Sequence, residues 1–168
     1  MSTLQAFLQA MIQETERRLF DESVPRIKKC LSLVTESEVW YVPNQETNSI
    51  GNLILHLNGN VRQWILSGLL GQVDFRKRQQ EFDAKGEYNK EELTELLELL
   101  EKDIREGLAT VQSDELLRVR PVQVYEETGL SIFIHVIEHF SYHVGQITYI
   151  VKSLKGIDTQ YYEGINLE

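Results

Sequence analysis

Apolar residues recur every three or four positions along four long segments, and this spacing constrains the fold more than any other feature. Such a period places the apolar side chains on one face of an α-helix. The predicted helices cover approximately residues 3–34, 49–70, 90–112 and 130–154. Pro25 lies inside the first and lacks a backbone N–H, so we expect a kink there or two helices nearly in line. Four amphipathic helices without a convincing sheet favour an all-α four-helix bundle.

The segments between these helices carry topological information of their own. About 18 residues connect the second and third helices, which is too long for a simple hairpin. At roughly 3.3 Å per extended residue this connection can run the length of a ~30 Å helix, which permits a crossover with helices two and three parallel. The β-forming residues within 116–128 suggest an extended excursion, and the tail 157–168 is expected to fold back as a flap. We expect residues 1–168 to form one domain.

Composition and charge exclude several functions. The chain has 26 acidic and 17 basic residues, a net charge of −9, which repels nucleic-acid phosphates and anionic lipid. No apolar run approaches the roughly 20 residues needed to cross a bilayer, and the N-terminus lacks the pattern of a signal peptide. The single cysteine, Cys30, cannot form an internal disulfide and is interpreted as a core thiol. We predict a cytoplasmic protein with neither a membrane nor a nucleic-acid partner.

All four histidines lie in two of the predicted helices. His56 is in the second, and His135, His139 and His143 are in the fourth. At 100° per residue, His139 and His143 fall at the centre of the apolar stripe and His135 falls at its edge. Because an unpartnered buried polar group is costly, two imidazoles one turn apart in a core require an explanation.

Two interpretations of this pair are open. Each histidine can be a neutral core residue bonded to a carbonyl or a buried water. Alternatively, His139 and His143 hold a divalent metal with a ligand from another helix, because His-x3-His brings both rings within reach of one ion. His135 lies about 12 Å along the axis from His143, so one ion would not take all three. His56 is then the remaining candidate for the third ligand, and His135 is a candidate base or a neighbour of the ligands.

Amide side chains accompany the histidines on both helices. Asn60 and Gln63 follow His56 beside the core-facing stripe, and Gln146 follows His143 by three residues. We expect these residues to hydrogen-bond the ligands from outside or to contact a substrate. The alternative is ordinary polarity of a helix surface.

Two motifs resemble a known superfamily. Residues 48–56, Asn-Ser-Ile-Gly-Asn-Leu-Ile-Leu-His, followed by Asn60 and Trp64, resemble the second helix of DinB-like proteins. Residues 139–146, His-Phe-Ser-Tyr-His-Val-Gly-Gln, resemble their fourth-helix motif. The resemblance implies a four-helix bundle with a crossover connection, a homodimer, and a divalent metal, commonly nickel or zinc, on His56, His139 and His143. His135 departs from the pattern.

The resemblance also implies an activity, because relatives include transferases that use small thiols such as bacillithiol or mycothiol. Three neutral ligands would leave the charge of a divalent ion unbalanced, which favours the thiolate of a bound thiol and its attack on an electrophilic substrate. We therefore expect a metal-dependent S-transferase that uses a low-molecular-weight thiol. A metal-dependent hydrolase is the enzymatic alternative, although Glu138 points away and leaves His135 as its base. A non-catalytic metal-binding stress protein is the other alternative.

The expected homodimer has one further source in the sequence. Aromatic residues lie outside the predicted helices in a number that could form an apolar patch on the surface. They include Trp40, Tyr41, Tyr161 and Tyr162.

Overall fold

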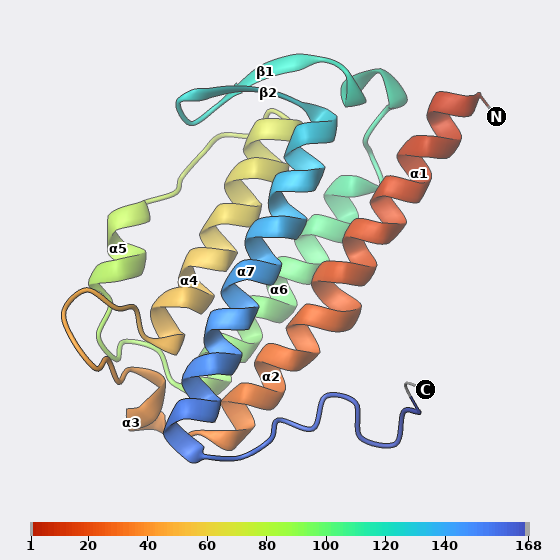
Figure 1. Ribbon diagram of the computed structural model, residues 1–168. Helices are drawn as coiled ribbons and strands as arrows, with labels where there is room; N and C mark the ends of the chain where they lie inside the picture. Colours follow the sequence, from red (N-terminus) through yellow and green to blue (C-terminus); the bar gives the residue numbers. More distant parts are fainter. Residues whose placement is uncertain (1, 167–168) are drawn as a thin grey trace.

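Four long helical segments dominate the computed structural model, which describes residues 2–166 (Figure 1). The first is a continuous run of α1 (Thr3–Glu16), the π-helical η1 (Arg17–Ser23) and α2 (Val24–Leu33). The second joins α4 (Ile50–Val61) to the π-helical η2 (Arg62–Leu69). The third and fourth are α6 (Lys90–Leu108) and α7 (Gly129–Lys155). The shorter elements are α3 (Glu36–Val39), α5 (Arg78–Asp83), η3 (Ser113–Leu116), β1 (Val119–Val122) and β2 (Tyr125–Thr128). The prediction of a mostly helical protein is confirmed.

Local sequence explains where the helices begin and end. Ser49 caps α4 and Asn89 caps α6, each through a capping box with the residue three positions later. Gly156, at φ 65°, closes α7 in the left-handed conformation that glycine adopts without strain. Helix α6 ends at Leu108 rather than at the predicted residue 112, because the next residues form a turn closed by the N–H groups of Thr110 and Val111.

Pro25 produces the irregularity that the sequence predicts. The helix is π-helical over η1, immediately before the proline, and returns to α-helical geometry with Pro25 in the first turn of α2. A proline there has no N–H to donate to the preceding turn, so the wider π geometry accommodates the missing bond.

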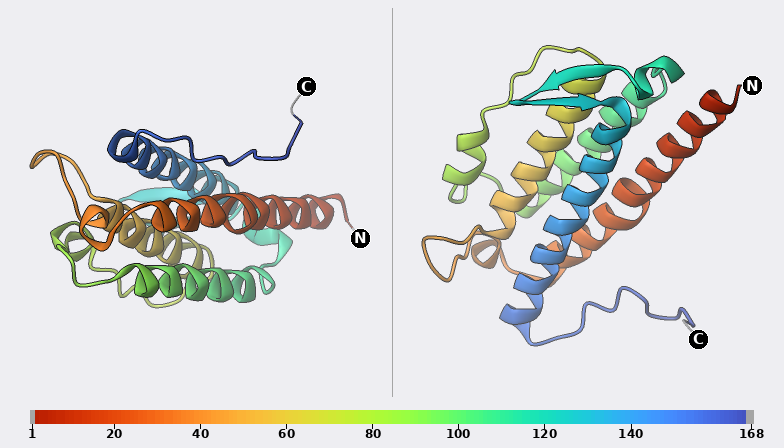
Figure 2. Two further views of the ribbon diagram at one scale, coloured as in Figure 1. Left: turned by 90° about the horizontal axis from the view of Figure 1, so that it is seen from below. Right: turned by 45° about the horizontal axis from the view of Figure 1, so that its top comes forward.

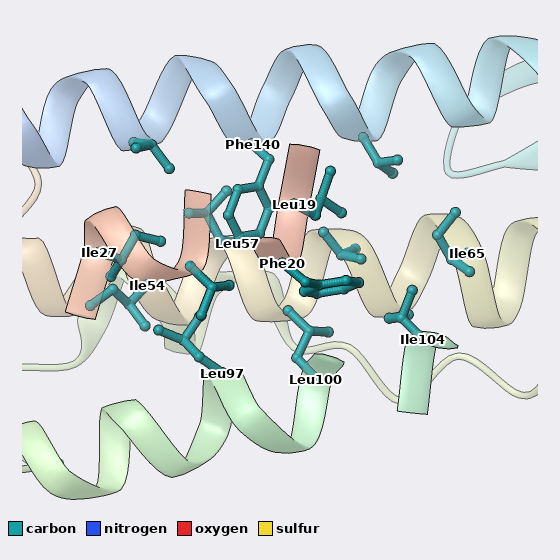
Figure 3. Close-up of a cluster of buried hydrophobic side chains, with 14 of the residues drawn as sticks. Leu19, Phe20, Ile27, Ile54, Leu57, Ile65, Leu97, Leu100, Ile104 and Phe140 are labelled. Carbon is teal, nitrogen blue, oxygen red and sulfur yellow. The ribbon is translucent and has the colours of Figure 1, made fainter. Parts of the chain in front are cut away.

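A single contiguous apolar core lies between the four long segments. Figure 3 shows Phe20, Leu57, Leu100 and Phe140, from four different segments, facing one another. These side chains are at most 3% exposed. Truncation of such a core residue to alanine costs about 2–5 kcal/mol, so this packing fixes the relative positions of α4 and α7.

The connections lie at the ends and along one side of the helices. In Figure 1, α4 and α6 run in the same direction, and the segment between them returns past α4 and carries α5. Strands β1 and β2 form an antiparallel hairpin, with Val119 opposite Thr128 and Val122 opposite Tyr125. Figure 2 shows this hairpin across the end of the helices where η2 stops and α7 begins. The hairpin adds a small sheet to the expected all-α fold.

The tail after α7 returns along α2, as the flap predicted from its aromatic residues. The Tyr161 hydroxyl lies 3.0 Å from Cys30 Sγ and 2.7 Å from Thr148 Oγ1. Cys30 is fully buried, in agreement with its interpretation as a core thiol. Among the described residues, no helix is both long and apolar enough to span a membrane.

Candidate metal centre

Three imidazoles converge on one point between α4 and α7. His56 comes from the middle of α4, and His139 and His143 come from successive turns of α7. Nε2 of His139 lies 3.1 Å from Nε2 of His56 and 3.3 Å from Nε2 of His143. Two nitrogens bound tetrahedrally to one zinc-like ion at about 2.05 Å would lie about 3.3 Å apart. The spacing of the three nitrogens therefore fits a shared metal ion.

Hydrogen bonds on the far side of two rings determine where their protons lie. Nδ1 of His56 lies 2.9 Å from Oε2 of Glu81, and Nδ1 of His143 lies 2.6 Å from Oε1 of Gln146. Both oxygens are acceptors, so each Nδ1 carries the proton and each Nε2 keeps a lone pair directed at the cluster. Nδ1 of His139 is buried without a hydrogen-bond partner among the described residues.

The surroundings keep the α7 imidazoles neutral. Burial, followed by the nearby His143 and His56, lowers the pKa of His139 to about 3. Burial also lowers the pKa of His143, against the opposing effect of its hydrogen bond to Gln146. Neutral imidazoles are the form that binds a metal, so the two α7 side chains are chemically ready as ligands.

The 70–89 connection contributes two buried side chains to this site, Arg76 and Glu81. The Arg76 side chain is 4% exposed and that of Glu81 is 10% exposed. Arg76 Nε donates to Glu81 Oε1 at 2.6 Å, and Arg76 Nη2 donates to Glu81 Oε2 at 2.8 Å. Burial alone would raise the pKa of Glu81, but the hydrogen bonds from Arg76 and His56 outweigh it and lower that pKa. Glu81 is therefore an anion beside His56.

The other predicted polar residues occupy distinct places. Gln146 contacts His143 directly. Gln63 reaches no histidine, and its Oε1 instead accepts a hydrogen bond of 2.8 Å from Arg76 Nη1. Asn60 Nδ2 lies 3.4 Å from Nε2 of His135, a long contact outside the three-imidazole cluster. The structure thus brings Gln146 to the cluster and places Asn60 and Gln63 around it.

A cavity of about 320 Å³ lies beside the cluster. His135 lines it without joining the three converging nitrogens, and its ring stacks on Trp64 with 3.5 Å between centroids and 14° between planes. Burial lowers the pKa of His135, while Glu127 opposes this effect. The hairpin and the 70–89 connection complete the wall with Gln123, Tyr125, Glu127, Arg76 and Arg78. Sequence reasoning missed these five residues because none lies on a periodic helix face near a histidine.

Two solved structures of low sequence identity share this fold. A DinB-like protein from Bacillus subtilis is 15% identical, with a TM-score of 0.64 over 89% of this chain and 94% of its own. A DinB-like protein from Bacillus cereus is 14% identical, with a TM-score of 0.67 over 90% of this chain and 94% of its own. No curated protein matches the chain.

The chain shares the fold of these two DinB-like proteins, in agreement with the fold that the resemblance of its motifs implies. The chain belongs to the family described as "Protein of unknown function (DUF1572)", whose profile matches residues 5–163. The buried to half-buried cluster of His56, His139 and His143 is compatible with metal binding.

Proposed function

We propose that this chain is a metal-dependent S-transferase, in which His56, His139 and His143 hold one divalent ion that activates a small thiol. The observation that carries the proposal is the convergence of three Nε2 atoms, with two of the rings held by acceptors at Nδ1. Imidazole ligands suit zinc, nickel, cobalt or copper better than magnesium or calcium, and we propose nickel or zinc here. The proposal takes the four long segments as a four-helix bundle with the 70–89 connection as its crossover.

The charge around the cluster supports an anionic reactant. The three ligands are neutral, and the Glu81 carboxylate is already paired with Arg76. A divalent ion at this position would therefore keep its positive charge and favour the thiolate form of a thiol beside it. The cavity of about 320 Å³ gives a small thiol access next to His139. Cys30 is buried away from the site against Tyr161, so the chain's own thiol takes no part.

Three residues that line the cavity would bind and orient the reactants. Trp64 and His135 form a flat stacked wall against which a substrate can pack. Arg78, whose guanidinium lies 4.8 Å from the Phe82 ring centroid, places a positive charge at the same cavity. These groups would orient the thiol and its electrophile, and His135 is available to accept or return a proton.

A metal-dependent hydrolase is the second candidate, and one observation favours it. Hydrolysis at a metal commonly uses a carboxylate base, and Glu138 is exposed on α7. Glu127, however, lines the cavity with His135 and acts electrostatically on that imidazole. A Glu127–His135 pair would supply the general base that Glu138 on α7 does not provide.

The deciding experiment first establishes the metal and then the reaction. Purified protein from supplemented medium is analysed for its elements, with His139→Ala as the comparison. We expect one ion per chain in the wild type and its loss in the variant. Substoichiometric metal in the wild type would contradict the proposal at its first step.

Metal-loaded protein is then incubated with bacillithiol, mycothiol, glutathione or coenzyme A and a generic electrophile, beside an ester and amide panel. Conjugation that disappears in His143→Ala supports the transferase. Hydrolysis without added thiol that is lost in Glu127→Gln supports the hydrolase instead. Full metal occupancy with no turnover in either assay would favour a non-catalytic metal-binding protein.

A further inference from the structure

The carboxylate of Glu81 is the acceptor that determines which nitrogen of His56 carries the proton. Its Oε2 lies 2.9 Å from Nδ1, and both side chains are at most 10% exposed. Arg76 Nη2 lies 3.1 Å from the same Nδ1 and 2.8 Å from Oε2. Arg76 can only donate, so two donors, the guanidinium and Nδ1–H, share one carboxylate. Without that carboxylate, Arg76 would face Nδ1 alone.

On helix α4, Gly59 leaves the space that this carboxylate occupies. A Cβ atom at Gly59 would lie 2.1 Å from Oε1 of Glu81 and 3.0 Å from Nε of Arg76. Any other residue at position 59 would therefore force the ion pair outward, because no real Cβ contact is that short. Gly59 follows His56 by three residues, so it lies on the same side of α4, one turn along.

The backbone of the connection is anchored at the same helix. Nδ2 of Asn52 donates to the carbonyl oxygens of Glu81 and Ala84, both at 2.9 Å. Asn52 is buried and also forms the capping box with Ser49. The first turn of α4 thus fixes the path of the chain that delivers Glu81 to His56.

We propose that Glu81 is a positioning residue that keeps His56 in the Nδ1–H form, with Arg76 holding its charge and Gly59 providing its space. The role is specific to His56, because His143 has a neutral amide in the equivalent position and Nδ1 of His139 has no partner within residues 2–166. Removal of the carboxylate leaves Arg76 as the donor to Nδ1, so the proton moves to Nε2 and occupies the lone pair directed at the cluster.

The experiment determines the tautomer of His56 directly in the metal-free protein. Two-bond ¹⁵N–¹H spectra of the imidazoles distinguish Nδ1–H from Nε2–H. We expect Nδ1–H in the wild type, Nε2–H in Glu81→Ala, and a partial return toward Nδ1–H in Glu81→Ala/Arg76→Ala, which removes the competing donor. A His56 that is Nε2–H in the wild type, or unchanged in Glu81→Ala, would overturn the proposal.

The affinity for zinc gives a second measurement. This measurement rests on the proposed function, whereas the measurement of the His56 tautomer does not. In competition titrations with Zn²⁺, Glu81→Ala and Gly59→Ala should each weaken binding by about 10- to 100-fold. Asp83→Asn removes an exposed carboxylate from the same connection that accepts from Gln79, and Gly145→Ala adds a methyl group on α7 where nothing among the described residues lies within 4 Å. Both should bind as the wild type does.

The outcomes separate the two proposals. A wild type that binds no zinc but shows the expected tautomers contradicts the proposed function and leaves Glu81 as a positioning residue. Zinc binding that is equal in wild type, Glu81→Ala and Gly59→Ala contradicts the role of Glu81. Should Glu81→Ala fail to fold, Gly59→Ala displaces the same carboxylate and is judged by the same spectra.

Discussion

Individual histidines differ in what the sequence reveals about them. Helical phase alone places His139 and His143 on the buried face of α7, and the structure has their Nε2 atoms 3.3 Å apart. His56 is 83 residues away from His139 in the chain; the sequence left it as the remaining candidate for the third ligand, and the motif resemblance implied the same residue. Glu81 and Arg76 could not be predicted, because they lie on a non-periodic connection whose path depends on the distant amide of Asn52.

Asn60 tests whether the amides around the site act on the ligands. Its amide contacts His135 at 3.4 Å and none of the three clustered imidazoles, and its Oδ1 is buried without a hydrogen-bond partner in the described part of the chain. We expect Asn60→Leu to leave zinc affinity within about twofold while reducing turnover, because the contact to His135 is lost and the ligands are not. Competition titration and steady-state kinetics separate the two effects. A loss of zinc affinity comparable to that of His139→Ala would place Asn60 among the groups that support the ligands.

Among the elements, the β1–β2 hairpin is held to the helices in part by one side chain, Arg120. Arg120 Nη1 donates to the carbonyl of Leu69 at 2.5 Å, and its Nη2 donates to the carbonyl of Glu115 at 2.9 Å. These bonds tie the hairpin to the end of η2 and carry Gln123, Tyr125 and Glu127 to the cavity. The β-forming residues predicted an extended segment here, but they could not predict its docking, which uses the Leu69 carbonyl 51 residues away from Arg120.

Arg120→Ala should therefore loosen the hairpin while the helices persist. We expect a loss of about 1–3 kcal/mol in the free energy of unfolding, because the Leu69 and Glu115 carbonyls lose a charged donor. Urea titration measures this loss, and amide hydrogen exchange should accelerate over residues 119–128. Arg118→Ala is the control, since the Arg118 side chain is 69% exposed and forms a surface ion pair with Glu115. Equal effects of the two variants would argue against the anchoring role of Arg120.

At the scale of the whole molecule, the tail flap closes over the buried thiol of α2. Burial raises the pKa of Cys30, and burial together with Cys30 raises the pKa of Tyr161 to about 12. Both groups are neutral in the folded protein and ionise more easily once unfolded, with ordinary pKa values of 9.0 and 10.0. The stability they contribute is thus complete below about pH 9 and is lost as pH rises from 9 toward 12.

Thermal unfolding between pH 8 and pH 11 measures this effect. The melting temperature of the wild type should fall more steeply with pH than that of Cys30→Ala/Tyr161→Phe, in which neither group can ionise. Tyr162→Phe, at a 52% exposed position, should follow the wild type. Parallel curves for the wild type and the double variant would show that the flap does not suppress ionisation.

Association into a homodimer is the remaining prediction for the whole molecule. Of the aromatics expected to contribute, Trp40 is packed against Gly51 and Tyr161 against Cys30, whereas Tyr41 and Tyr162 are exposed. The outer face of α7 adds Ile134, Tyr142 and Tyr149, each more than half exposed. We propose that this face pairs with a second copy.

Light scattering should give a molar mass of about twice 19.5 kDa for the wild type. The substitution Tyr149→Glu should lower this mass toward that of one chain. Leu117→Glu is the matched control, because Leu117 is 67% exposed but lies between η3 and β1, away from α7 and outside the aromatic set. A mass of 19.5 kDa across a wide concentration range would exclude the dimer.

The three imidazoles come from helices that meet only when the chain is folded, so a metal ion held by all three would couple metal supply to the lifetime of the protein. His139 and His143 are neighbours in any helical fragment, but His56 reaches them only through the packed core. An ion held by all three binds the native state alone, and at 100 times its dissociation constant it adds about 2.7 kcal/mol to the free energy of unfolding. A cell short of that metal would hold a larger unfolded fraction of this chain, which proteases remove. The abundance of the protein would then rise and fall with the metal, without any change in its synthesis.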